Sequence, residues 1–179
     1  MRFLHTADWH LGRSLHNTSL IEDQAYVLDQ IVNIVKDSKP QTLIIAGDIY
    51  DRAVPPIEAI QLLDEILSRL VLDLHTPIIL IAGNHDSPQR LQFASRLVET
   101  LKLHIFATML DQAKFIQLYD EFGAVCFYPL PYAEVSIARE YLHDENITTH
   151  ELAIQKWISQ IKSTQPVNAR AVLINHAFV

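Results

Sequence analysis

Cysteine and glycine are scarce in this chain, which has one cysteine and four glycines among 179 residues. The lone Cys126 cannot form an internal disulfide, so a small scaffold held by disulfides is excluded and a reducing compartment is favoured. The low glycine content excludes a collagen-like chain, and a hydrophobic content of 49% excludes wholesale disorder. The composition therefore predicts a chain that folds around a buried core.

An excess of positive charge is also missing, because 14 Lys and Arg oppose 21 Asp and Glu and the formal net charge is −7. The overall charge provides no footprint for nucleic acid, although bound divalent cations or local arginines can reverse the field at a site. No apolar run approaches the ~18 residues that a membrane span requires, and the N-terminal apolar stretch is too short for a signal peptide. We therefore expect a soluble cytoplasmic protein with no membrane partner.

The length suits one domain that covers residues 1–179. Residues 171–179 form an apolar run of the kind found inside a domain, whereas chain termini are usually polar and exposed. We therefore expect the domain to be incomplete at its C-terminal end.

Short apolar runs rich in β-branched residues alternate with helical patterns along the chain. The runs predict buried strands at residues 2–6, 42–46, 78–82 and 171–175. Apolar residues at helical spacing predict helices around 28–35 and 57–70, and a third helix that begins after Pro88 and extends to Leu101. Strands that alternate with helices favour parallel βαβ units in an α/β domain.

The pattern changes after residue 102. Residues 115–118 and 124–128 flank the sequence Asp120-Glu121-Phe122-Gly123, which predicts an antiparallel hairpin with a glycine-assisted turn. A further helix is expected around 151–161, before the last strand. We therefore predict a layered α/β fold with helices outside, built on either one mixed sheet or two packed sheets.

Each predicted parallel strand is followed by polar side chains that can bind a metal. These side chains are Asp8 and His10, Asp48 and Asp51, Asn84 and His85, and His176. Because the carboxyl ends of strands in an open α/β sheet meet at one edge, we expect these residues to converge. Oxygen and nitrogen ligands without a thiolate suit Mn²⁺, Fe or Zn²⁺, and several carboxylates with several imidazoles indicate a two-metal centre that cleaves phosphate esters. Each residue alone also fits a turn, a cap or a buried histidine, but the four coincidences together favour a metal site.

These motifs resemble the signature of the calcineurin-like metallophosphoesterase superfamily. The matching residues are Asp8-x-His10, Gly47-Asp48-x-x-Asp51, Gly83-Asn84-His85-Asp86 and the later His176. The flanking residues are more specific, because residues 5–12, 47–56 and 82–87 closely resemble the SbcD family of nuclease subunits. The resemblance covers essentially the whole chain and implies a metallophosphoesterase-type fold, with mixed sheets flanked by helices.

The resemblance also implies a role for each residue of the site. Two divalent metal ions, Mn²⁺ above all, would be held by five side chains: Asp8 and His10 at the first metal, Asp48 between the metals, and Asn84 and His176 at the second. His85 would protonate or stabilise the leaving oxygen, and Asp51 would orient His85 through a hydrogen bond and favour its protonated form. The superfamily closes its site with a late Gly-x-His or Gly-His-x-His motif. This motif does not follow His176, so we expect the metal site of this chain to be incomplete.

The activity implied is that of a DNA nuclease subunit, which hydrolyses phosphodiesters at DNA ends and hairpins in repair and recombination. Its partners would be DNA, an SbcC-type ATPase subunit and a second copy of the chain, with the helix at 57–70 or the earlier helix as the dimer face. Arg13, Arg52 and Arg90 would contact phosphates without reading sequence, or are solvated loop charges. Two alternatives stay open: a metallophosphoesterase for small phosphodiesters or phosphoproteins, and a non-catalytic fragment for dimerisation or partner docking.

Overall fold

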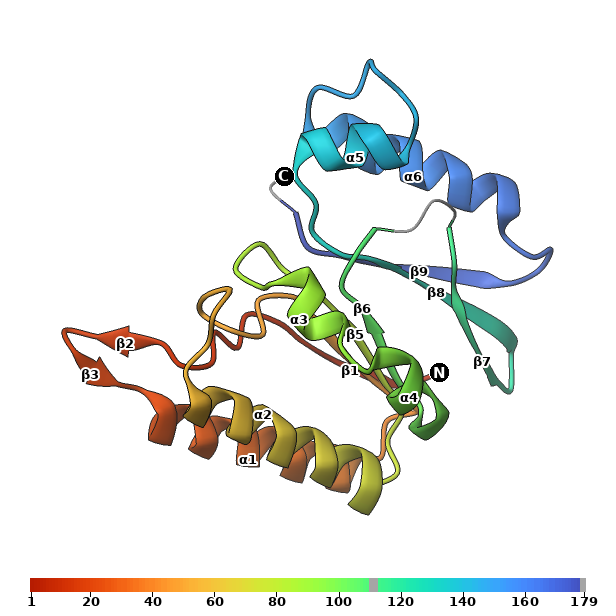
Figure 1. The fold of residues 1–179 in the computed structure, drawn as a ribbon. Helices are drawn as coiled ribbons and strands as arrows, with labels where there is room; N and C mark the ends of the chain where they lie inside the picture. The colour runs from red at the N-terminus through yellow and green to blue at the C-terminus, as the bar shows by residue number, and fades with distance from the viewer. Residues whose placement is uncertain (110–112, 178–179) are drawn as a thin grey trace.

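Two β-sheets lie face to face at the centre of the molecule, and helices cover the outer face of each sheet (Figure 1). The computed structural model describes residues 1–109 and 113–177. The predicted layered α/β fold with mixed sheets flanked by helices is confirmed, and the arrangement is the one with two packed sheets. Within the described residues, no helix is both long and apolar enough to cross a membrane.

The first sheet contains four parallel strands in the order β1-β4-β5-β6. Their bounds are Phe3–Thr6 (β1), Thr42–Ala46 (β4), Ile78–Ile81 (β5) and Leu103–Phe106 (β6). The central strand β4 is buried along its whole length because other elements cover both of its faces. Leu43 of β4 pairs with Leu4 on one side and with Ile78 on the other. The carboxyl ends of β1, β4 and β5 therefore lie level at one edge of the sheet.

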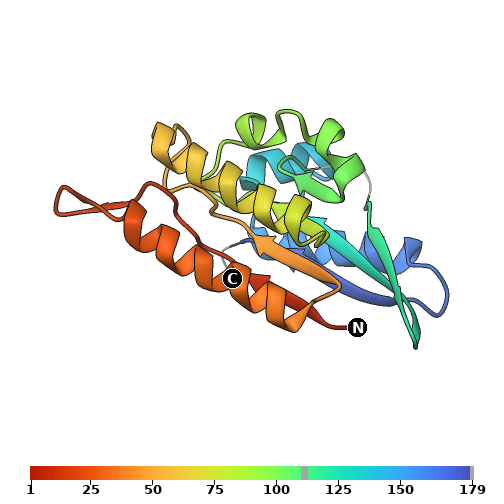
Figure 2. The ribbon, with the colours of Figure 1, turned by 90° about the horizontal axis from the view of Figure 1, so that it is seen from below.

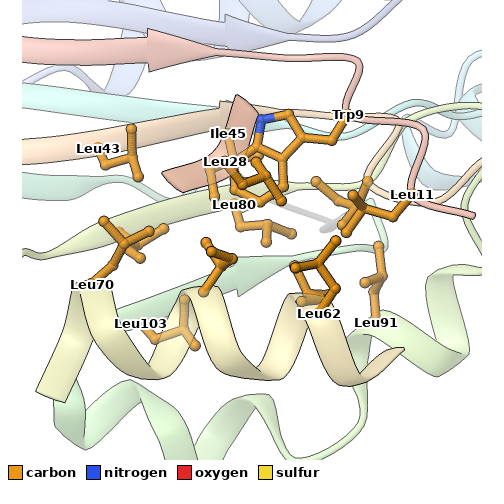
Figure 3. Packing of buried hydrophobic residues seen from close by; sticks show 14 of the residues in the cluster. Trp9, Leu11, Leu28, Leu43, Ile45, Leu62, Leu70, Leu80, Leu91 and Leu103 are labelled. Atoms are coloured by element: carbon orange, nitrogen blue, oxygen red, sulfur yellow. The ribbon is translucent and has the colours of Figure 1, made fainter. Parts of the chain in front are cut away.

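Two helices that run side by side in the same direction cover the outer face of this sheet (Figure 2). They are α1 (Ile21–Ser38) and α2 (Ile57–Ser68), and a π-helical turn, η1 (Arg69–Asp73), extends α2. α1 ends at Lys39, which has a left-handed backbone and comes directly before Pro40. The apolar faces of the helices meet the sheet in one core, and Figure 3 shows part of it: Leu28, Leu62 and Leu70 beside Leu43, Ile45 and Leu80. Full burial of each such leucine stabilises the fold by about 1.5–3 kcal/mol.

The second sheet is mixed and has the order β7-β8-β9. Its strands are β7 (Ile116–Asp120), β8 (Gly123–Leu130) and β9 (Arg170–Asn175), with β7 antiparallel and β9 parallel to β8. The hairpin expected around Asp120 and Gly123 is confirmed as β7–β8. The connection from β8 to β9 carries α5 (Val135–Tyr141) and α6 (His150–Thr164), which cover the outer face of this sheet (Figure 1).

The inner faces of the two sheets pack against each other through a second core. Its buried members are Ile44, Ala46, Ile79 and Ile81 from the first sheet and Val125, Phe127 and Ile174 from the second. At the amino-terminal ends of β8 and β9, the α-amino group of Met1 and the guanidinium group of Arg170 both donate to the carboxylate of Asp120. The sheets are therefore joined by apolar packing along their length and by an ion-pair cluster at one end.

Four local features differ from the sequence-based expectations. The helix expected from Pro88 to Leu101 is broken into α3 (Pro88–Gln92), α4 (Ser95–Val98) and the 3₁₀ turn η2 (Glu99–Leu101). The break lies at Ala94, which has a φ of 59°, while the amide of Gln92 bonds the backbone of Ile105 and Ala107. Strand β6 and helix α5 were not expected. A small hairpin of β2 (Ser14–Leu15) and β3 (Thr18–Ser19) also leaves the body of the domain before α1 (Figure 1).

Candidate metal centre

The loops that follow four strands meet at the carboxyl ends of the sheets and bring the five predicted ligands together: Asp8, His10, Asp48, Asn84 and His176. The loops after β1 and β4 run side by side, because the N–H of Asp8 donates to the carbonyl of Gly47 at 3.0 Å and the N–H of His10 donates to that of Asp48 at 2.9 Å. His176 arrives from β9, in the second sheet, and not from the edge of the same open sheet as the other residues. The site therefore lies where the ends of the two sheets meet.

Three of the predicted ligands have a left-handed backbone. The φ angles are 57° at Asp8, 45° at His10 and 51° at Asp48. For a residue other than glycine this conformation costs about 1–3 kcal/mol and persists only where the surroundings enforce it. Such positions cluster at functional sites, so the strain at three neighbouring polar residues is consistent with a site that holds a ligand.

Asp48 occupies the middle of the group and is only 3% exposed. Its Oδ2 atom lies 3.5 Å from Nε2 of His10, and its Oδ1 atom lies 3.5 Å from Nε2 of His176. Oδ1 also accepts a hydrogen bond from the N–H of His85 at 3.0 Å. The two carboxylate oxygens thus face opposite halves of the site, which is the arrangement expected of a carboxylate that bridges two metal ions.

The surroundings of His176 indicate where a cation would fit. Nδ1 of His176 lies 2.8 Å from the carbonyl oxygen of Ala46, which can only accept, so Nδ1 carries the hydrogen. In the neutral ring, Nε2 then carries a lone pair and no hydrogen. This atom lies 3.1 Å from Oδ1 of Asn84 and 3.5 Å from Oδ1 of Asp48. Acceptors that converge in this way require a proton or a cation among them. Ligand atoms of Asp8, Asp48 and His176 all lie within 4.8 Å of one another, so these side chains fit a divalent ion.

The family model for calcineurin-like phosphoesterases matches residues 1–176. The chain belongs to the calcineurin-like phosphoesterase family. Members of this family are phosphoesterases that use divalent metals, and the side-chain oxygen and nitrogen atoms around Asp48 suit such metals. The chain is also similar to a solved structure of YfcE, a phosphoesterase from E. coli, with 20% sequence identity and a TM-score of 0.36. That match covers 75% of this chain and 58% of the YfcE chain, so the chain spans less than two thirds of the length of that protein.

His85, the residue expected to act on the leaving group, lies exposed at the mouth of the site. Its ring stands edge-on to that of His10, with the centroids 4.8 Å apart. The expected hydrogen bond to Asp51 is present, but the acceptor is the backbone carbonyl of Asp51, 2.9 Å from Nδ1 of His85. The Asp51 carboxylate faces His10 instead, with Oδ1 3.5 Å from Nδ1 of His10.

Asp86 connects the loops of the site, although the sequence motif that contains it predicted no role for this residue. This buried carboxylate accepts hydrogen bonds from the N–H groups of Ile49 at 3.1 Å, Tyr50 at 2.9 Å and Gly83 at 2.8 Å. It therefore ties the loop after β4 to the loop after β5. Burial raises the pKa of Asp86, and the three N–H donors oppose that shift. Burial also raises the pKa of Tyr50 to about 12, with a smaller contribution from the charge of Asp86.

The three arginines proposed to contact phosphate are exposed and lie on the loops of the site or next to them. Arg13 is at the base of the β2–β3 hairpin, Arg52 follows Asp51, and Arg90 is in α3. Within the part of the chain that the structure describes, none of these three side chains makes an ion pair. Their guanidinium groups are therefore available to a negatively charged ligand.

Proposed function

We propose that this phosphoesterase is a DNA nuclease subunit of the SbcD type, which hydrolyses phosphodiester bonds at DNA ends and hairpins together with an SbcC-type ATPase in DNA repair and recombination. The observation that carries the proposal is the convergence of acceptor atoms from four loops on the buried carboxylate of Asp48. The resemblance of residues 5–12, 47–56 and 82–87 to SbcD nucleases favours DNA over other phosphodiesters.

Two Mn²⁺ ions are the proposed cofactor. Asp8, His10 and Asp48 would hold one ion, and Asp48, Asn84 and His176 would hold the other. When bound, such ions neutralise charge on a phosphodiester and activate water for in-line attack. The donor set contains oxygen and nitrogen without sulfur, which suits Mn²⁺.

His85 supplies the proton in this proposal. Because the Asp51 carbonyl can only accept, Nδ1 of His85 carries the hydrogen between them, and Nε2 carries a proton only when the ring is an imidazolium. Donation from Nε2 to a leaving oxygen therefore requires the imidazolium form of the ring.

DNA would be held by its phosphates, because the chain as a whole is acidic. Arg13, Arg52 and Arg90 extend from the loops around the metal ligands and would add local positive charge to that of the ions. Phosphate contacts position a duplex without reading its bases, so cleavage should have little sequence preference.

The proposed nuclease activity is tested with the chain, Mn²⁺, the ATPase partner with ATP, and linear or hairpin DNA. We expect cleavage by the wild type, and we expect His85→Gln to lose cleavage while it keeps its affinity for Mn²⁺. Normal cleavage by His85→Gln would show that His85 is not the proton donor. Turnover of cyclic nucleotides, small aryl phosphodiesters or phosphopeptides without DNA cleavage would favour the alternative phosphoesterase. Failure to bind Mn²⁺ would favour a non-catalytic docking fragment.

We infer that a second copy of the chain packs on the start of α2 and the end of α3. Four apolar side chains are exposed there: Val54 (65%), Ile57 (70%), Ile60 (46%) and Phe93 (83%). Two of them, Ile60 and Phe93, line an apolar hollow of about 700 Å³ between α2 and α3. An exposed apolar group of this kind indicates a protein interface. Sedimentation equilibrium should show that the wild type is a dimer and that Ile57→Glu dissociates this dimer. The control Ile34→Glu, on the outer side of α1, should leave the dimer intact. The reverse result would place the dimer face on α1.

A further inference from the structure

Nδ1 of His10 is a buried polar atom without a hydrogen-bond partner among the described residues. Oδ1 of Asp51 lies 3.5 Å from this atom, which is longer than a hydrogen bond. Both side chains are largely covered, with 17% of His10 and 21% of Asp51 exposed. A buried donor that stays unsatisfied costs about 1–3 kcal/mol, so native sites rarely leave one without a partner.

The opposite nitrogen of the same ring explains why the partner of Nδ1 matters. Nε2 of His10 faces Oδ2 of Asp48 at 3.5 Å and Oδ1 of Asp8 at 3.9 Å. A histidine binds a metal through an unprotonated nitrogen, so Nε2 can serve as a ligand here only if Nδ1 carries the hydrogen. A carboxylate that accepts a hydrogen bond from Nδ1 selects that tautomer and holds the ring in place.

Asp51 has two acceptors, and the structure directs them to different histidines. Its backbone carbonyl lies 2.9 Å from Nδ1 of His85 and already satisfies that atom. Its carboxylate is turned to the other histidine and lies among ligand atoms of His10 and His85 that are all within 4.8 Å of one another. The carboxylate of Asp51 is therefore not needed to orient His85.

We propose that Asp51 is a positioning residue for His10: its carboxylate accepts the Nδ1 hydrogen of His10 and thereby presents Nε2 to the metal next to Asp48. The backbone carbonyl of Asp51 holds His85 independently of the side chain. The proposal rests on the metal centre proposed above, but it does not depend on which phosphodiester the enzyme cleaves.

The tautomer of His10 provides a test in the metal-free chain. Long-range ¹H–¹⁵N spectra of histidine-labelled protein above neutral pH distinguish the two tautomers, and His10→Gln assigns the signals of His10. We expect His10 to carry its hydrogen on Nδ1 in the wild type and in Asp51→Asn, which keeps a neutral acceptor. Asp51→Ala should shift His10 towards the mixed population of an unconstrained ring. The signals of the histidines outside the site should stay in place and report that the variant is folded.

Metal affinity provides the second test, with Mn²⁺ alone as the probe and a chelator competition as the readout. Loss of a carboxylate behind a ligating histidine weakens metal binding by about 10–100-fold. We expect that loss for one ion in Asp51→Ala, a smaller loss in Asp51→Asn, and an unchanged affinity in the matched control His85→Ala.

The outcomes separate this proposal from the proposed function. If Asp51→Ala keeps both the Nδ1 tautomer of His10 and the affinity for Mn²⁺, the positioning role is wrong. If it loses cleavage while tautomer and affinity are unchanged, the carboxylate acts on His85 and the proposal is equally overturned. If the wild type binds no Mn²⁺, the proposed metal centre fails, and the tautomer experiment still decides whether Asp51 orients His10.

Discussion

Among the single residues of the site, two glycines leave the space that the Asp48 carboxylate and its neighbour His176 occupy. A Cβ atom on Gly83 would overlap Oδ1, Cγ and the backbone nitrogen of Asp48, and a Cβ on Gly47 would overlap the ring of His176. Gly47 also has a φ of 90°, which side chains rarely adopt. Asp48 and His176 can therefore reach their positions only because the adjacent loops have no side chain at these two points.

Gly83→Ala should weaken metal binding with little effect on the core. The added methyl group would push the Asp48 carboxylate away from Nε2 of His10 or of His176, because the overlap includes the backbone nitrogen and Cγ of Asp48 as well as its Oδ1. We expect a loss of about tenfold or more in Mn²⁺ affinity, the scale of a displaced supporting group in a metal site, measured by chelator competition.

The matched control is Gly123→Ala in the β7–β8 turn. A Cβ there meets nothing within 4 Å, but the φ of 107° makes a side chain unfavourable. This variant should lose about 1–2 kcal/mol of unfolding free energy and none of its Mn²⁺ affinity. Equal affinities of Gly83→Ala and the wild type would mean that the loop adjusts and that Gly83 does not set the position of Asp48.

The site depends, at the scale of elements, on how the loops after β4 and β5 are joined. Asp86 belongs to the second of these loops and accepts hydrogen bonds from both. One donor is Ile49, 37 residues earlier in the chain, and another is Gly83, 3 residues earlier. The same two loops carry Asp48 and Asn84. Asp86 thus fixes the two loops that carry these predicted ligands relative to each other.

Asp86→Asn should destabilise both the fold and the contact between the loops after β4 and β5. One of the two carboxylate oxygens becomes an NH₂ group that faces a backbone N–H, so at least one buried donor loses its acceptor. We expect a loss of about 1–3 kcal/mol in unfolding free energy, measured by urea denaturation. Asp64→Asn, at an exposed position of α2, is the control and should change stability by less than about 0.5 kcal/mol. A neutral effect of Asp86→Asn would contradict the role given to the three N–H bonds.

The elements around the site were largely predictable from the sequence, and the exceptions have physical reasons. Strands β1, β4 and β5 are apolar runs that end at polar motifs, so both their type and their ends could be recognised. Strand β6 is followed by no such motif, so the sequence does not mark where it ends. The motifs at the strand ends marked the side chains that the structure brings together around Asp48, and the resemblance to the phosphoesterase signature implied which of them would be ligands. The bonds of Asp86 could not be predicted, because their donors are backbone N–H groups that no sequence pattern marks.

The two sheets are the largest units of the molecule, and the site forms only while they keep their position relative to each other. Asp8, Asp48 and Asn84 come from the first sheet, whereas His176 comes from the second. The inner core around Phe127 holds the sheets together along their length. The cluster of Asp120, Arg170 and the α-amino group of Met1 holds them at the far end of the strands. The contacts at that end therefore act on the geometry of the site only through the relative position of the sheets.

Arg170→Met should reduce stability in a way that depends on pH. Hydrogen bonds from Arg170, and then from the α-amino group, hold the pKa of Asp120 well below its usual range. A carboxyl group with a lowered pKa contributes stability above its unfolded pKa of about 3.9, and that contribution is lost as the pH falls through the folded pKa. We therefore expect the wild type to be more stable than Arg170→Met at pH 7 and the difference to shrink below about pH 4. Urea denaturation between pH 7 and pH 2.5 measures this, and Arg96→Met, at an exposed arginine without an ion pair among the described residues, should show no such trend. A difference between the wild type and Arg170→Met that stays constant across this range would show that Arg170 stabilises the sheets by packing and not through the charge of Asp120.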